Sequence, residues 1–358
     1  YLQPFEASVA AGVSTIMPAF NDLNGIPATA NNFLLQQILR DEWNFDGLVV
    51  SDWAAITEMI AHGYCTDGKE AAEKAANAGI DMEMATPNFE KHLQELIQSG
   101  KVSIKTIDNA VRNILRIKFR LGLFENPYVD ASNFPELVND YYLATAKQIT
   151  TESIVMLKND NNVLPLSEKI NSLAVIGPMA DDKFEQLGTW TFDKQIEDTQ
   201  TPLASLKEEL GKTVNIHYAK GLEISRSKDH KYFAEAVAAA EKSEVVLMFM
   251  GEEAIITGEA HCRANIDLPG AQEDLIKAIA KTGKPIVMIV MSGRALTMGN
   301  ILEDVEAILY AFHPGTMGGP ALVDLITGRK SPSGKVPITF PKVVGQIQIY
   351  YNHKSTSR

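Results

Sequence analysis

Carboxylate side chains stand directly after apolar runs at two places in the sequence. The first is the Ser51-Asp52-Trp53 triplet, which follows the apolar residues 48–50. Functional groups gather at the carboxyl ends of strands in barrels and in open parallel sheets. An ionised Asp52 at such an end can act as a nucleophile, a general base or a metal ligand, and Trp53 offers a flat apolar face for stacking. The alternative is that Asp52 caps the following helix while Trp53 packs in the core.

The second acidic stretch follows the apolar run that ends at Met250. Glu252 and Glu253 come first, and Glu259 lies a few residues downstream, close to His261 and Arg263. A loop of this kind can present a general acid, and a neighbouring arginine or histidine can pair with the acid or tune it. The alternative is a solvated acidic loop without a chemical role. From these residues alone, any of the three glutamates is a candidate proton donor.

Other chemistry-bearing residues give no pattern that predicts a metal or a cofactor. His62, His217 and His313 have no partners at metal-ligand spacing and are interpreted as structural. The sequence contains no phosphate-binding loop and no nucleophile elbow, and the Gly177-Pro178 pair is not part of a dinucleotide fingerprint. Two cysteines, in one chain of this length, are expected to be free thiols.

The composition excludes two classes of partner. The 358 residues include 33 lysines and arginines against 45 aspartates and glutamates, which gives a formal net charge of -12. Nucleic-acid binding needs clustered positive charge, so we expect no nucleic-acid partner. The longest apolar runs, such as residues 245–250 and 286–291, have the length of a strand. We therefore expect no membrane span.

The elements that must position Asp52 alternate between strand and helix. Strands are predicted at 13–17, 45–50 and 80–84, and helices at 5–11, 32–42, 70–78, 89–99 and 104–121. This alternation indicates a parallel α/β arrangement with right-handed crossovers. Three strands cannot bury themselves, so the region is expected to be a piece of a larger sheet or barrel.

The elements that must position the glutamates form a second α/β region after a connector. A long helix is predicted at 141–157. Strands are predicted at 172–177, 213–219, 244–250, 284–291 and 307–312, with helices at 233–242, 271–281 and 319–327. Five strands with intervening helices predict a doubly wound layer. The predicted organisation is 1–127, 128–150 as linker and helix, and 151–358.

Several sequence pieces together resemble one known family. The pieces are residues 17–21, 24–29, 47–53, 152–159, 257–263, 314–319, 332–337 and 340–341. In this order they resemble glycoside hydrolase family 3, and most of all its bacterial β-glucosidases of the periplasmic type. The resemblance covers nearly the whole chain. It implies an α/β fold, with the C-terminal portion of a (β/α)8-type barrel followed by an α/β sandwich domain.

The resemblance also implies a role for individual residues. Asp52 corresponds to the family's catalytic nucleophile, and Glu259, rather than Glu252 or Glu253, corresponds to its acid/base. Residues 1–127 would carry the nucleophile and residues 151–358 the acid/base. Trp53 would line the aglycone side, and Met17 and Phe20 would lie near the sugar. No metal and no cofactor are implied.

The implied activity is that of a retaining, exo-acting hydrolase. It would release β-D-glucose from the non-reducing end of β-glucosides or cello-oligosaccharides by double displacement. The alternatives are a β-xylosidase or related exo-glycosidase, and an inactive or carbohydrate-binding fragment. The chain is expected to start just before the sixth barrel strand, so the expected partners are a glycoside, a completing N-terminal segment, or a second copy in a homodimer. The expected location is periplasmic or secreted.

Overall fold

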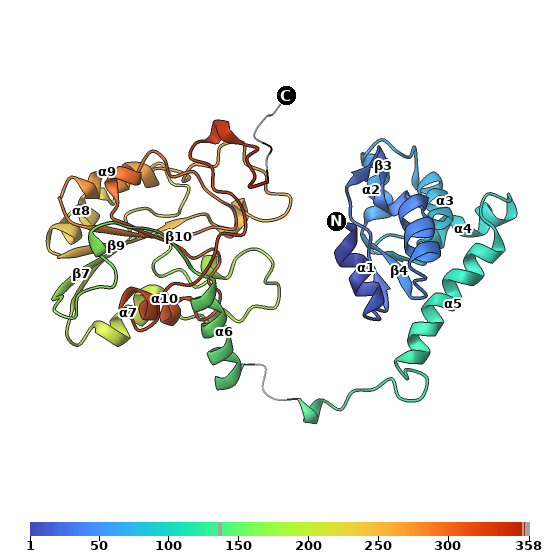
Figure 1. The fold of residues 1–358 in the computed structure, drawn as a ribbon, viewed down its shortest axis with the longest axis horizontal. Helices are drawn as coiled ribbons and strands as arrows, with labels where there is room; N and C mark the ends of the chain where they lie inside the picture. Colours follow the sequence, from blue (N-terminus) through green and yellow to red (C-terminus); the bar gives the residue numbers. More distant parts are fainter. Residues whose placement is uncertain (135–137, 353, 355–358) are drawn as a thin grey trace. The chain divides into compact units, whose positions relative to one another are not determined.

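The computed structural model describes residues 1–134, 138–352 and 354. The chain divides into two compact units, residues 1–134 (unit 1) and residues 135–358 (unit 2), as the blue-to-teal and green-to-red parts of Figure 1 show. The boundary falls inside the predicted connector. Each unit has hydrophobic clusters of its own, and each is described by itself below.

Unit 1 is built on a parallel sheet with the strand order β1-β4-β5. Its strands are β1 (Thr15–Ile16), β4 (Leu48–Trp53) and β5 (Met82–Met84), and β2 (Asp22–Leu23) pairs with β3 (Ile26–Pro27) as a small separate hairpin. Its helices are α1 (Leu2–Ala10), a π-helix over Phe33–Glu42, α2 (Ala55–Ala61), α3 (Gly68–Ala78), α4 (Asn88–Gln98) and α5 (Ile104–Arg120). The three predicted parallel strands are therefore confirmed, and each is shorter or shifted relative to its predicted range.

Local sequence signals explain where the helices of unit 1 begin and end. The Asp67 side chain accepts a hydrogen bond from the Glu70 N–H (2.9 Å) at the start of α3, and Gly79 ends that helix at a φ of 109°. Five of the alanines in α3 are buried, and this helix packs closely against α2 and α4. Ser103 caps α5 in the same way, through the Thr106 N–H (3.0 Å).

Unit 2 is a six-stranded sheet with helices on both faces. Its strands are β6 (Val155–Asn159), β7 (Ser172–Ile176), β8 (Asn215–Ala219), β9 (Val245–Gly251), β10 (Ile286–Met291) and β11 (Ala307–Tyr310). Its helices are α6 (Asp140–Ser153), α7 (Pro202–Leu210), α8 (Phe233–Glu241), α9 (Gln272–Ala280) and α10 (Gly318–Ile326). The strand order is β6-β11-β10-β9-β7-β8.

The two faces of this sheet carry separate cores. Helices α8 and α9 cover one face, and α7 and α10 cover the other (Figure 1). The central strands β9 and β10 are buried almost along their whole length, which is why they read as continuous apolar runs in the sequence.

One prediction for unit 2 was wrong. The helix predicted at 141–157 ends at Ser153, and the chain continues as β6, which pairs antiparallel with β11. The sheet therefore has six strands, with one antiparallel edge strand added to the five predicted ones. In the described part of the chain, no helix is both long and apolar enough to cross a membrane.

Candidate active site

Asp52 lies near the carboxyl end of β4 in unit 1. The strand continues through Ser51, Asp52 and Trp53, where the prediction ended it at residue 50. The pairing of β4 with β5 shifts register between Val50 and Trp53, which marks a bulge at the candidate nucleophile. Bulges of this kind re-aim a side chain at a strand end. The Ser51 hydroxyl accepts a hydrogen bond from the Met84 N–H (2.9 Å) and so ties the bulge to β5.

The capping alternative for Asp52 was wrong. Helix α2 begins after Ala54, which has a φ of 56°, and no side chain caps it. The Asp52 carboxylate instead accepts a hydrogen bond from the Trp53 N–H (2.6 Å), and Asp52 is half-buried. Trp53 is not a core residue, because 69% of its surface is exposed. Both side chains are therefore available at the surface of unit 1.

Two further candidates lie at the same edge of the sheet. Met17 directly follows β1, the neighbour of β4, and Phe20 comes three residues later. Met17 is exposed and Phe20 is half-buried. Unit 1 thus has Met17 and Phe20 after the carboxyl end of β1, and Asp52 and Trp53 at the carboxyl end of the adjacent parallel strand β4, the edge where functional groups of such a sheet were expected.

Glu252 and Glu253 follow β9 in unit 2 and are buried. Glu252 is completely buried and forms ion pairs with both Arg263 and Arg294. Glu253 accepts hydrogen bonds from the Ser225 hydroxyl (2.8 Å) and the Arg226 N–H (3.2 Å). The solvated-loop alternative was therefore wrong for these two glutamates, since their carboxylates are internal and already paired.

Glu259 differs from them in its exposure. It lies on the loop of residues 254–263 (the 254–263 loop), between Gly258 (φ 93°) and Ala260 (φ 61°), and all three residues are exposed. Arg263, which could pair with any of the three candidate acids, binds Glu252. Of the three candidate glutamates, Glu259 is the one whose carboxyl group a dissolved molecule can reach.

The histidines and cysteines have structural surroundings. His62 lies 3.6 Å from the Asp22 carboxylate, and burial lowers the pKa of His313. Cys65 is buried, Cys262 is exposed, and both are free, as predicted. Among the described residues, no three histidine, cysteine or carboxylate side chains are grouped closely enough to hold a metal ion.

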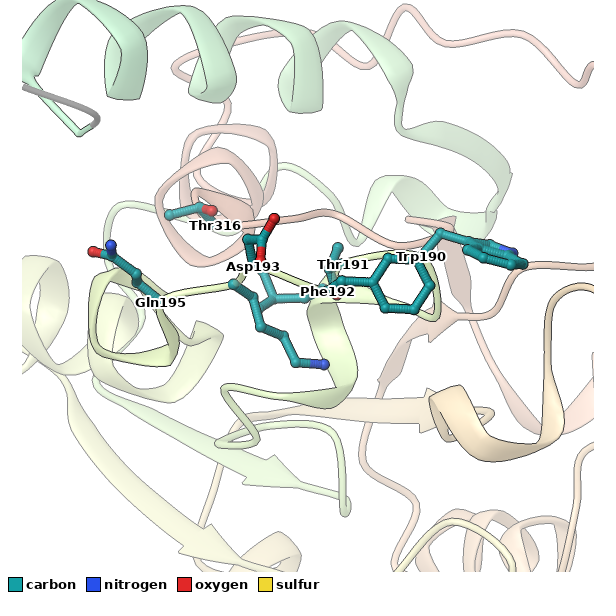
Figure 2. A pocket seen from close by; sticks show the side chains of 8 residues that line it. Trp190, Thr191, Phe192, Asp193, Gln195 and Thr316 are labelled. Carbon is teal, nitrogen blue, oxygen red and sulfur yellow. The ribbon is translucent and has the colours of Figure 1, made fainter. Parts of the chain in front are cut away.

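Unit 2 also contains a surface pocket that the sequence reasoning missed. It has a volume of about 450 Å³ and is lined by Leu187, Trp190, Thr191, Phe192, Asp193, Lys194, Gln195 and Thr316. Figure 2 shows the exposed rings of Trp190 and Phe192 beside the polar side chains; the ring centroids are 5.1 Å apart and nearly perpendicular. The alternation of aromatic and polar residues at 190–195 was the available signal. Aromatic faces combined with a few polar groups are typical of small-molecule sites.

The fold and the candidate residues together define a class of protein. The protein is an α/β protein of two units, and each unit carries an accessible carboxylate at or beyond the carboxyl end of a parallel strand: Asp52 within the end of β4 in unit 1, and Glu259 after β9 in unit 2.

Comparison with known sequences identifies the family. The Glycosyl hydrolase family 3 N terminal domain matches residues 1–117, and the Glycosyl hydrolase family 3 C-terminal domain matches residues 154–358. The chain belongs to glycosyl hydrolase family 3. The family resemblance and the α/β fold class predicted from the sequence are confirmed.

Named relatives of the chain include a periplasmic beta-glucosidase of Salmonella typhimurium, which is 38% identical over 100% of this chain and 50% of the relative. A beta-xylosidase of Formosa agariphila is 37% identical over 98% of this chain and 50% of the relative. The solved beta-glucosidase of Listeria innocua in complex with glucose superposes with a TM-score of 0.92 and 36% identity, over 100% of this chain and 49% of that one. The chain thus spans about half the length of the relatives it matches.

Proposed function

We propose that the protein is a retaining, exo-acting β-glucosidase, with Asp52 as nucleophile and Glu259 as acid/base. The observation that carries the proposal is the different environment of the carboxylates. The Asp52 side chain lies at a strand end and caps no helix, and the Glu259 side chain is exposed. The side chains of Glu252 and Glu253, in contrast, are buried and paired. The family membership supplies the reaction class, and the relatives named beta-glucosidase support the substrate.

The two carboxyl groups would act in two successive displacements. Asp52 would attack the anomeric carbon while Glu259 protonates the leaving oxygen, which gives a covalent glycosyl-enzyme intermediate. Glu259 would then remove a proton from water as that water attacks the same carbon, and Asp52 would leave. Retaining enzymes hold these two groups about 5–5.5 Å apart. In this proposal unit 1 supplies the nucleophile and unit 2 supplies the acid/base.

Three side chains of unit 1 are proposed to contact the substrate. Met17 and Phe20 would lie near the sugar, and Trp53 would line the aglycone side. The exposed indole of Trp53 supports this assignment, because an aromatic face left in water is suited to stacking on a ring.

Loss of the nucleophile gives the first test. Asp52→Ala should abolish turnover of p-nitrophenyl β-glucoside, and azide should restore it as a glycosyl azide of inverted configuration. Asp46→Ala, which removes an exposed carboxylate of the same unit, serves as the control and should retain activity. Full activity of Asp52→Ala would exclude Asp52 as the nucleophile.

Loss of the acid/base gives the second test. Glu259→Ala should spare the first step for substrates with good leaving groups, because these need no protonation, and should slow it for poor ones. An equal loss for all leaving groups would exclude Glu259 from this role.

A second candidate function is β-xylosidase, and the relative of that name at 37% identity favours it. Hydrolysis of a panel of p-nitrophenyl glycosides separates the two by the ratio of kcat/KM for glucoside and xyloside. No hydrolysis of any glycoside by the folded chain would support the remaining alternative, an inactive or carbohydrate-binding fragment.

A periplasmic or secreted location is proposed from the periplasmic relative, and cell fractionation with an antibody would test it. A second copy of the chain is the proposed macromolecular partner, and light scattering of the purified chain would measure its oligomeric state.

A further inference from the structure

A single buried carboxylate, that of Glu252, binds two arginines beneath the 254–263 loop. Its side chain is completely buried. One carboxylate oxygen accepts a hydrogen bond from Nη1 of Arg263, and the other accepts hydrogen bonds from Oγ of Ser292 (2.6 Å) and Nε of Arg294 (3.0 Å). A buried carboxylate of this kind is stable only while its charged partners remain in place.

Arg294 extends from this carboxylate to both sides of Glu259. Its Nη2 donates to the backbone oxygen of Ile256 (2.7 Å) and to that of His261 (2.8 Å). These two carbonyls come before and after Glu259 in the sequence, so one guanidinium joins the two arms of the loop. Because Nε of the same guanidinium is bonded to Glu252, that carboxylate orients the whole group.

Arg263 fixes the far end of the loop to the same carboxylate. It is the last residue of the 254–263 loop, and its Nη2 also donates to the Asp267 backbone oxygen (3.1 Å). Glu252 therefore binds two guanidinium groups. That of Arg294 joins the two arms of the loop, and that of Arg263 belongs to the last residue of the loop.

Few other interactions define the path of the loop. Residues 257–263 belong to no helix and no strand, and two left-handed residues flank Glu259. The Thr189 hydroxyl donates to the backbone oxygens of Ala254 (3.1 Å) and Thr257 (2.9 Å), which lie before the two left-handed residues. The Ala254 N–H also donates to the Glu185 carboxylate, and the His261 N–H donates to the Gly258 backbone oxygen (3.3 Å), which closes a turn around Glu259. Outside that turn, side-chain hydrogen bonds to the loop backbone hold the two arms of the loop.

We propose that Glu252 is a positioning residue that holds the 254–263 loop, and through it the carboxyl group of Glu259. The catalytic part of this inference rests on the proposed function of Glu259. Glu252 itself is sealed from the surface and does not touch the substrate. Its effect on catalysis follows from geometry, because a displacement of about 1 Å in a reacting group can cost about a hundredfold in rate.

Hydrogen exchange of the full 358-residue chain tests the structural half without any activity. In Glu252→Gln the shape is kept and the charge is lost, so amides of the 254–263 loop should exchange about tenfold faster or more, while β9 and β10 stay protected. Arg294→Lys keeps the positive charge but loses the guanidinium that bonds the backbone oxygens of Ile256 and His261. It should give the same increase in the exchange rate of the loop amides. The Arg294 side chain is 22% exposed, whereas that of Glu252 is completely buried, so Arg294→Lys also provides the test if Glu252→Gln does not fold.

Glu253→Gln is the matched control. Glu253 is the next residue in the sequence and is also buried, but its carboxylate binds Ser225 and Arg226 rather than Arg263 and Arg294. Exchange in the 254–263 loop should stay unchanged in this variant. The same exchange rate in Glu252→Gln, Arg294→Lys and wild type, or an equal increase in Glu253→Gln, would overturn the proposal.

Leaving-group dependence tests the catalytic half. Glu252→Gln should lose about tenfold or more in kcat/KM, which reports the first displacement, on methyl β-glucoside, which needs a proton donor, and little in kcat/KM on 2,4-dinitrophenyl β-glucoside. An equal loss on both substrates would show a merely structural role and would overturn the positioning claim. If the wild-type chain hydrolyses neither substrate, the proposed function fails, and the exchange measurement still decides whether Glu252 holds the loop.

Discussion

Replacing Asp81 in unit 1 should remove much of the stability of the sheet that carries Asp52. The Asp81 side chain is 6% exposed and accepts hydrogen bonds from Nη2 of Arg40 (2.7 Å), the Val49 N–H (2.8 Å) and Nδ2 of Asn113 (2.9 Å). It therefore joins the start of β5 to β4, to the π-helix and to α5. Burial raises the pKa of Asp81 and lowers that of Arg40, and the opposite charge of the partner offsets part of both shifts.

The expected loss of stability in Asp81→Asn follows from the burial of this ion pair. Asp81→Asn keeps the shape of the side chain but leaves the guanidinium of Arg40, 15% exposed, without its counter-charge. Removing one partner of a buried pair costs about 3–5 kcal/mol. With a urea dependence of about 2 kcal/mol per molar for a unit of this size, the unfolding midpoint of unit 1 should fall by about 1.5–2.5 M.

Tryptophan fluorescence during urea unfolding measures this midpoint. The background variant is Trp190→Phe, because the other tryptophans, Trp43 and Trp53, lie in unit 1. Asp46→Asn is the control: it removes a carboxylate that pairs with an arginine at the exposed surface, and it should change the midpoint little.

A double variant separates charge from packing. Asp81→Asn combined with Arg40→Met should recover part of the lost stability, since no uncompensated charge remains. The reasoning is refuted if Asp81→Asn lowers the midpoint no more than Asp46→Asn does.

Three further predictions concern other residues. Burial raises the pKa of Tyr310 to about 12, so the folded chain keeps a proton that the unfolded chain loses above pH 10. The free energy of unfolding of unit 2 should therefore fall by up to about 1.4 kcal/mol per pH unit between pH 10 and 12, and Tyr310→Phe should remove this slope in alkaline urea titrations. A Cβ on Gly251, at φ 143°, would lie 1.8 Å from the Met291 backbone oxygen, so Gly251→Ala should cost about 2–5 kcal/mol by urea unfolding. Under native conditions an aromatic disulfide reagent should modify Cys262 quickly and Cys65 only after unfolding, because Cys65 is buried and its pKa is raised; two fast equivalents would contradict this.

The parts of the fold that the sequence predicted well are those with a strong local pattern. Strands β9 and β10 are apolar on both faces and could be recognised without knowledge of their neighbours. The place of Asp52 at the carboxyl end of its strand was also predictable, because Asp52 follows an apolar run and functional groups collect where such runs end.

Other features depend on residues far away in the sequence. Residues 155–159 were predicted as the end of a helix, yet they form β6, because their partner strand β11 supplies hydrogen bonds from residues 307–310. Likewise, two adjacent glutamates after β9 suggested a solvated loop. Their burial is possible only because Arg294, which follows β10, reaches Glu252. Pairing of this kind leaves no signal in the local sequence.

The pairing of β6 with β11 has a consequence for the order in which unit 2 can fold. In this sheet the first strand along the chain lies beside the last one, with Val155 opposite Tyr310. A ribosome adds about 5–20 residues per second, so β6 emerges about 8–30 s before its partner exists. During that interval the apolar residues Ile154 and Val155, both buried in the finished sheet, have no strand to cover them. The strand that comes first along the chain in this sheet can therefore be paired only after the last strand, β11, has been synthesised.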